Sequence, residues 1–174
     1  MKIRIYLIED YEPDAEAILR ELNQVAQSKN TDDLQFEFIS LPGTNRKKVR
    51  EKEYLFYDDT IVNTLQKKRN TENKENIKIG VLLDVMLVQE DVESSYAHYY
   101  PEASIAKKIY FKFSDQMPIY LISAYPEFAT QCEVIMGENL SDKFITKNAV
   151  LRYHIQADID KMFDFYKKGC GLEG

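Results

Sequence analysis

The feature that most constrains this fold is the alternation of short apolar runs with longer segments whose apolar residues recur at helical spacing. Five runs have strand length, and they occupy residues 3–8, 34–41, 77–83, 118–122 and 143–146. Strands that alternate with helices are typical of βαβ units around a parallel sheet. The sequence therefore predicts an α/β fold, a doubly wound five-stranded parallel sheet with flanking helices.

Helices are expected in the gaps between these runs. The first follows Pro13, and the others are expected over residues 58–65, 104–113, 127–136 and 150–166. Pro13 and Pro126 stand where a helix would begin, and proline is favoured in the first helical turn. An apolar stripe runs along the last segment and predicts that it packs on the sheet. The stripe consists of Leu151, Ile155, Ile159, Met162, Phe163 and Tyr166.

The length of 174 residues fits one domain, which we expect over residues 1–168. Residues 42–76 are longer than a strand-to-helix connection requires, and we interpret them as an inserted, mobile segment between the second and third strands. Their basic run, residues 46–50, is a solvated face or a docking patch. An extended loop over residues 89–103 carries tyrosines that either pack on it or form a lid or partner surface. We expect residues 169–174 to be a tail, in part an expression remnant.

Composition narrows the classes of function. The formal charge of −6 argues against direct nucleic-acid binding, which depends on clustered lysine and arginine. The first apolar run is too short for a signal peptide or a membrane span, so we expect a cytoplasmic protein without membrane contact. Cys132 and Cys170 are far apart and suggest neither a disulfide framework nor a thiolate metal site.

Polar residues follow four of the five strands directly. Glu9 and Asp10 follow the first strand, Asp84 the third, Ser123 the fourth and Lys147 the fifth. Ligands of open parallel sheets bind at the carboxyl ends of the strands, so these side chains should converge there. Three carboxylates without a nearby histidine favour Mg²⁺, completed by a backbone carbonyl and water. Any one of these aspartates alone could instead be a helix cap.

In these motifs the sequence resembles the receiver domains of bacterial response regulators. Most of the chain is covered by the resemblance. It rests on four segments in order, namely residues 7–10 (LIED), 82–87 (LLDVML), 119–124 (IYLISA) and 142–147 (DKFITK). The resemblance implies a flavodoxin-like fold with strand order 2-1-3-4-5. It also implies a phosphoprotein of a two-component phosphorelay rather than an enzyme with turnover, since only its own phosphorylation and dephosphorylation would be catalysed.

The resemblance also implies a role for each site residue. Asp84 would accept the phosphoryl group as an aspartyl phosphate, donated by a sensor histidine kinase or phosphotransfer protein. Glu9, Asp10, Asp84 and the backbone carbonyl of Met86 would hold Mg²⁺. Lys147 would pair with the phosphoryl oxygens, while Ser123 and Phe144 would switch the surface that controls an output domain or downstream protein. Receivers often dimerise through their last two helices, so a homodimer is a further expectation.

Two departures from the family pattern stand beside the resemblance. Asn148 follows Lys147 where the family usually has proline, and the loop after Asp84 lacks the usual short turn. Phe144 is equally consistent with an ordinary core aromatic. Two alternative functions stay open, namely a receiver-like interaction scaffold that acts without phosphorylation and a Mg²⁺-dependent phosphohydrolase with an aspartyl-phosphate intermediate.

Overall fold

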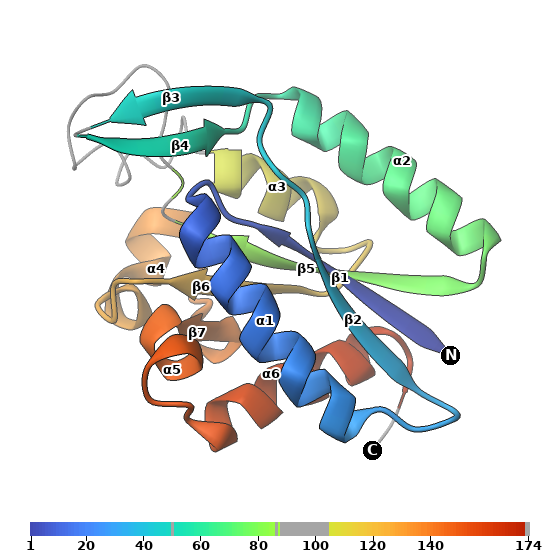
Figure 1. Ribbon diagram of the computed structural model, residues 1–174. Helices are drawn as coiled ribbons and strands as arrows, with labels where there is room; N and C mark the ends of the chain where they lie inside the picture. Colours follow the sequence, from blue (N-terminus) through green and yellow to red (C-terminus); the bar gives the residue numbers. More distant parts are fainter. Residues whose placement is uncertain (50, 86, 88–104, 173–174) are drawn as a thin grey trace.

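A computed structural model describes residues 1–49, 51–85, 87 and 105–172 of the chain (Figure 1). The strands are β1 (Lys2–Ile8), β2 (Gln35–Ser40), β3 (Asn45–Val49), β4 (Lys52–Phe56), β5 (Ile77–Asp84), β6 (Ile119–Ser123) and β7 (Phe144–Thr146). The helices are α1 (Glu12–Lys29), α2 (Thr60–Lys74), α3 (Ile105–Phe113), α4 (Phe128–Met136), α5 (Lys147–Leu151) and α6 (Gln156–Gly169). Within the described residues, no helix is long and apolar enough to cross a bilayer.

Five strands form one parallel sheet in the order β2-β1-β5-β6-β7, flanked by helices as predicted. Numbered along the chain, this order is 2-1-5-6-7 rather than the expected 2-1-3-4-5, because β3 and β4 come between the second and third strands of the sheet. Strands β3 and β4 were not predicted; they lie between β2 and α2 in sequence and pair with each other in a separate antiparallel sheet. The register aligns Ile8 with Leu83 and Asp84 with Ile122, so the strands end at one edge of the sheet.

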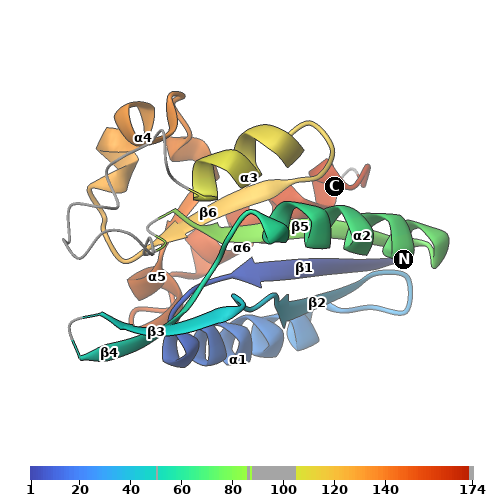
Figure 2. The same ribbon diagram turned by 90° about the horizontal axis from the view of Figure 1, so that it is seen from above.

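Helices cover both faces of the sheet, and Figure 2 shows the sheet between two helical layers. On one face, Ile18 and Leu22 of α1 pack with Met162 and Phe163 of α6 against β1. On the other, side chains of α2, α3 and α4 pack against β5 and β6, and Phe113 is fully buried there. Strands β5 and β6 are buried on both faces, which is why their sequences are continuous apolar runs.

The inserted segment is more regular than predicted. We expected residues 42–76 to be a mobile insertion with a short helix, but they contain the β3–β4 hairpin and the longer helix α2. The polar last turns of α2 are held by Glu72, which is 4% exposed. Its carboxylate accepts hydrogen bonds from the Arg4 guanidinium at 2.6 Å and the Tyr6 hydroxyl at 2.8 Å. The spacing of apolar residues in the sequence does not predict these buried polar contacts of Glu72. The predicted loop over residues 89–103 lies outside the described residues.

The predicted helix over residues 150–166 is wrong at its start. The structure has two helices, α5 and α6, and His154 between them has a positive φ of 46°. Ile155 continues the helical spacing in sequence, but it lies at the N-cap of α6 and is 41% exposed. The stripe from Ile159 to Tyr166 is buried as expected. The apolar spacing therefore concealed a break that depends on backbone geometry.

Candidate functional site

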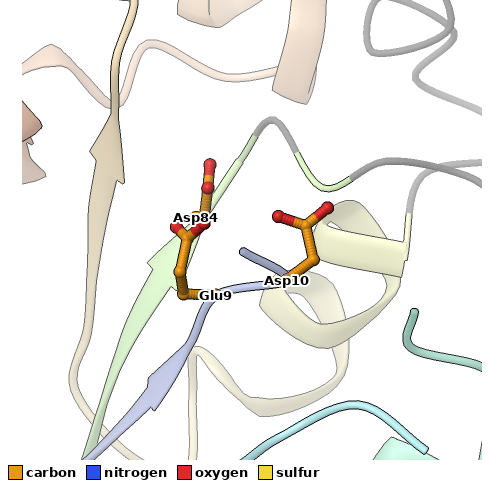
Figure 3. Close-up of side chains that lie close together, drawn as sticks. All are labelled: Glu9, Asp10 and Asp84. Atoms are coloured by element: carbon orange, nitrogen blue, oxygen red, sulfur yellow. The ribbon is translucent and has the colours of Figure 1, made fainter. Parts of the chain in front are cut away.

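The carboxyl ends of β1 and β5 bring three carboxylates together. Glu9, Asp10 and Asp84 are each at most 3% exposed. One oxygen from each lies within 4.8 Å of the others, and Figure 3 shows the carboxylates of Glu9 and Asp84 close together with Asp10 beside them. They are adjacent because Ile8 and Leu83, which precede Glu9 and Asp84, are partners in the register. This buried acidic cluster could bind a metal ion.

Lys147 contributes an ammonium group to the same cluster. Its Nζ lies 2.8 Å from Glu9 Oε2, 3.2 Å from Asp84 Oδ2 and 3.0 Å from Asp14 Oδ2. Lys147 is the first residue of α5, and the Thr146 hydroxyl caps that helix by accepting a hydrogen bond from the N–H of Ala149 at 3.0 Å. The cap fixes the turn after β7, where the sequence lacks the proline usual in receivers.

The electrostatics of the cluster follow from burial. Burial and the neighbouring Asp84 carboxylate raise the pKa of Glu9 well above its ordinary value, although Lys147 opposes the shift. Burial alone would lower the pKa of Lys147, but the Asp84 and Glu9 carboxylates outweigh it and raise that pKa. The ammonium therefore stays charged, and it stabilises ionised carboxylates that would otherwise repel one another.

Asp14 and Tyr57 also contact the cluster, although neither was predicted from the sequence. Asp14 lies in the first turn of α1, four residues after Asp10, and this spacing was a usable signal because the first helical turn lies next to the loop that carries Asp10. The Tyr57 hydroxyl accepts a hydrogen bond from the N–H of Glu9 at 3.2 Å and donates to the carbonyl of Leu41. Tyr57 thereby fixes the backbone at the end of β1, a role for which the sequence holds no pattern.

The other predicted site residues have different surroundings. Ser123 is fully buried at the end of β6, and its hydroxyl accepts a hydrogen bond from the N–H of Tyr125 at 3.1 Å. Phe144 is half-buried on β7 and packs on the core, with its ring centroid 4.8 Å from that of Phe128. This contact is consistent with the interpretation of Phe144 as an ordinary core aromatic, which the sequence had left open. Met86, whose backbone carbonyl was a predicted metal ligand, lies outside the described residues.

A cavity of about 240 Å³ opens beside the cluster. It is lined by Glu9, Asp10, Tyr11, Asp14, Lys52, Tyr54, Asp84, Ala124, Tyr125 and Lys147. A water molecule takes about 30 Å³ of liquid volume, so this space can accept a hydrated cation together with a small anionic group. The oxygen-only acidic set suits a hard cation, because imidazole and thiolate ligands are what softer metals prefer. The pocket thus combines a candidate cation site with a buried ammonium.

Comparisons with protein-family models, with curated proteins and with solved structures found no match for this chain.

Proposed function

We propose that this chain is a phosphoacceptor signalling module of the receiver kind, in which Asp84 accepts a phosphoryl group with Mg²⁺ bound at Glu9, Asp10 and Asp84. The observation that carries the proposal is the contact of Lys147 Nζ with the carboxylates of both Glu9 and Asp84, at 2.8 and 3.2 Å. These groups come from the ends of three different strands. A cation and an ammonium at one carboxylate are what transfer of a charged phosphoryl group requires.

In the proposed step, a carboxylate oxygen of Asp84 attacks the phosphorus of a phosphohistidine. A new P–O bond forms as the P–N bond breaks, and the leaving imidazole keeps the electron pair and takes up a proton. Mg²⁺, when bound, would offset the negative charge that builds up on the phosphoryl oxygens. Lys147 would hold one of those oxygens. Hydrolysis by water would return the Asp84 carboxylate and inorganic phosphate.

The proposed signal is a redistribution of charge at Asp84. An aspartyl phosphate carries strong acceptor oxygens that can draw the Ser123 hydroxyl away from its bond with the Tyr125 backbone. Strand β7 pairs with β6 beside Ser123, and its Phe144 contacts Phe128 of α4. A shift at Ser123 would therefore reach the surface formed by α4 and β7. A histidine kinase or phosphotransfer protein would supply the phosphoryl group, and an output domain or effector would bind that surface.

The proposal is tested by incubating the protein with a small acyl phosphate and Mg²⁺ and measuring its intact mass. We expect the gain of one phosphoryl group, lost on treatment with hydroxylamine, and no gain with Asp84→Asn or after chelation of Mg²⁺. Absence of any gain on the unaltered protein would refute the phosphoacceptor function and favour a scaffold that acts without phosphorylation. Continuous release of phosphate from many donors would favour the phosphohydrolase.

A further inference from the structure

The β3–β4 hairpin closes one side of the acidic pocket. It was inserted between β2 and α2, yet it lies beside the start of α1 and the loop after β1 (Figures 1 and 2). The N–H of Leu55 donates a hydrogen bond of 2.8 Å to the carbonyl of Asp10. The N–H of Thr44 donates one of 3.0 Å to the carbonyl of Phe56 at the base of the hairpin. The backbone of the candidate cation loop is therefore tied directly to β4.

Side-chain alternation determines what the hairpin presents to the pocket. Lys52, Tyr54 and Phe56 share one face of β4, because successive strand residues point to opposite sides. Phe56 is buried in the protein, which directs this face inward. Tyr54 and Tyr11 have ring centroids 5.4 Å apart, and Lys52 Nζ lies 5.4 Å from the Tyr11 ring centroid. Lys52 and Tyr54 accordingly line the same cavity as the carboxylates.

The two lysines of the pocket differ in their partners. Lys147 is shared by three carboxylates, whereas Lys52 rests over an aromatic ring and forms no ion pair with any described residue. Among the described residues, four carboxylates and two ammonium groups line the cavity, and together they carry a formal charge of −2. A bound divalent cation would neutralise this set. An anion that enters beside the cation then needs a further positive group, and Lys52 is the ammonium that is not yet engaged by a carboxylate.

We propose that Lys52 is a second anion-contacting residue of this pocket, carried over it by the β3–β4 hairpin, and that it binds the phosphoryl group of the donor opposite Lys147. The inference rests on the proposed function and adds to it a residue for binding the substrate. Tyr11 holds the Lys52 ammonium over the pocket through its ring face. Tyr54 fixes the orientation of Tyr11 by ring contact and is a positioning residue.

The test compares Lys52→Met with Lys48→Met. Lys48 lies on β3 of the same hairpin, is exposed and does not line the cavity, so its loss removes the same charge at a similar place in the chain. With an acyl phosphate below saturation and Mg²⁺ in excess, we expect Lys52→Met to gain its phosphoryl group about tenfold more slowly than the unaltered protein. Lys48→Met should match the unaltered protein, and Lys52→Arg should recover most of the rate.

Affinity for Mg²⁺, measured by calorimetry without donor, separates an electrostatic role from a structural one. Removing an ammonium from an acidic pocket should leave the affinity for Mg²⁺ unchanged or increase it, whereas displacement of the hairpin from Asp10 should weaken it. Equal rates for Lys52→Met and Lys48→Met, or a loss of Mg²⁺ affinity that parallels the loss of rate, would overturn this inference alone. Absence of phosphorylation in the unaltered protein would overturn the proposed function and the inference with it.

Discussion

Replacement of Lys147 by methionine tests whether its ammonium holds the acidic cluster together. The side chain is 11% exposed and contacts three carboxylates, of which Glu9 and Asp84 are nearly fully buried. Methionine retains much of the packing but leaves those carboxylates without their cation. Breaking a buried ion pair by removing one partner typically costs about 3–5 kcal/mol. We expect the free energy of unfolding to fall by about 3 kcal/mol at neutral pH without divalent cations.

The loss should depend on pH in a defined direction. The pKa of Glu9 is already raised by burial and Asp84, and removal of Lys147 raises it further. An acid whose pKa is higher in the folded protein is most favourable to folding below its unfolded pKa, about 4.3 for glutamate, and that stabilisation declines as the pH rises through the folded pKa. The variant should therefore lose little stability near about pH 5 and most near about pH 8, because protonation of the cluster replaces the missing ammonium.

Mg²⁺ should restore stability more effectively to the variant than to the unaltered protein. A ligand that binds only the folded state stabilises it by RT ln(1 + [L]/Kd), about 2.7 kcal/mol at one hundred times Kd. Without Lys147, electrostatic repulsion among the carboxylates is larger, so the gain on binding a divalent cation is larger too. The cation dependence and the pH dependence thus report the same carboxylate repulsion by independent means.

Urea unfolding followed by circular dichroism measures these effects. With a slope of about 2 kcal/mol per molar urea, a loss of 3 kcal/mol lowers the midpoint by roughly 1.5 M. The matched control is Lys108→Met, because Lys108 pairs with Asp59 in solvent and both side chains are about half or more exposed. Such surface pairs contribute about 0–1 kcal/mol. A Lys147 variant with an unchanged midpoint, or with a loss independent of both pH and Mg²⁺, would refute the reasoning.

Three further changes test the anchors of the fold. Tyr6→Phe removes a hydroxyl that donates to Glu72 at 2.8 Å and should cost about 1 kcal/mol by urea unfolding, whereas a neutral result would mean that Arg4 alone satisfies Glu72. Burial alone would raise the pKa of Glu37, but the hydrogen bonds from Lys2 and Arg4 outweigh it and hold that pKa below its ordinary value. Glu37→Gln should therefore lower the free energy of unfolding by up to about 1 kcal/mol at neutral pH, and this loss should vanish as acid protonates Glu37 in the unaltered protein. An added Cβ at Gly43 would lie 2.3 Å from the carbonyl oxygen of Leu55, so Gly43→Ala should destabilise the protein by about 1–3 kcal/mol and speed amide exchange at Leu55, and unchanged exchange would contradict this.

The parallel sheet and the acidic cluster at its edge were predictable because both depend on local patterns. Each central strand is buried on both faces and therefore appears as an unbroken apolar run, and the residue that ends such a run meets the ends of its neighbours. The predicted positions of Glu9, Asp84 and Lys147 needed only this rule. The proximity of these residues could therefore be predicted from the sequence without knowledge of any side-chain distance.

The elements that were missed depend on contacts between distant segments. The hairpin contains the basic run at residues 46–48, whose charges are compatible with strand structure because residues 45–48 of β3 are all solvent-exposed. Arg46 is held by Glu12 at 3.2 Å and Glu53 at 3.0 Å, partners that lie 34 and 7 residues away in sequence. The break between α5 and α6 likewise depends on the backbone at His154. Neither hydrophobic period nor residue type reports such interactions.

The difference between sheet and hairpin also bears on how a phosphodonor could reach Asp84. The cluster itself is built on buried strands, so its geometry is as stable as the core. The hairpin is joined to it through the bond from Leu55 to Asp10, the contact between Tyr54 and Tyr11, and an exposed ion pair between Arg46 and Glu12. Each such contact is worth about 1 kcal/mol or less. Lifting the outer part of the hairpin away from the pocket, with Phe56 still buried at its base, would therefore cost only a few kcal/mol while the cation site stays formed. A donor larger than the cavity could then gain access without unfolding the sheet.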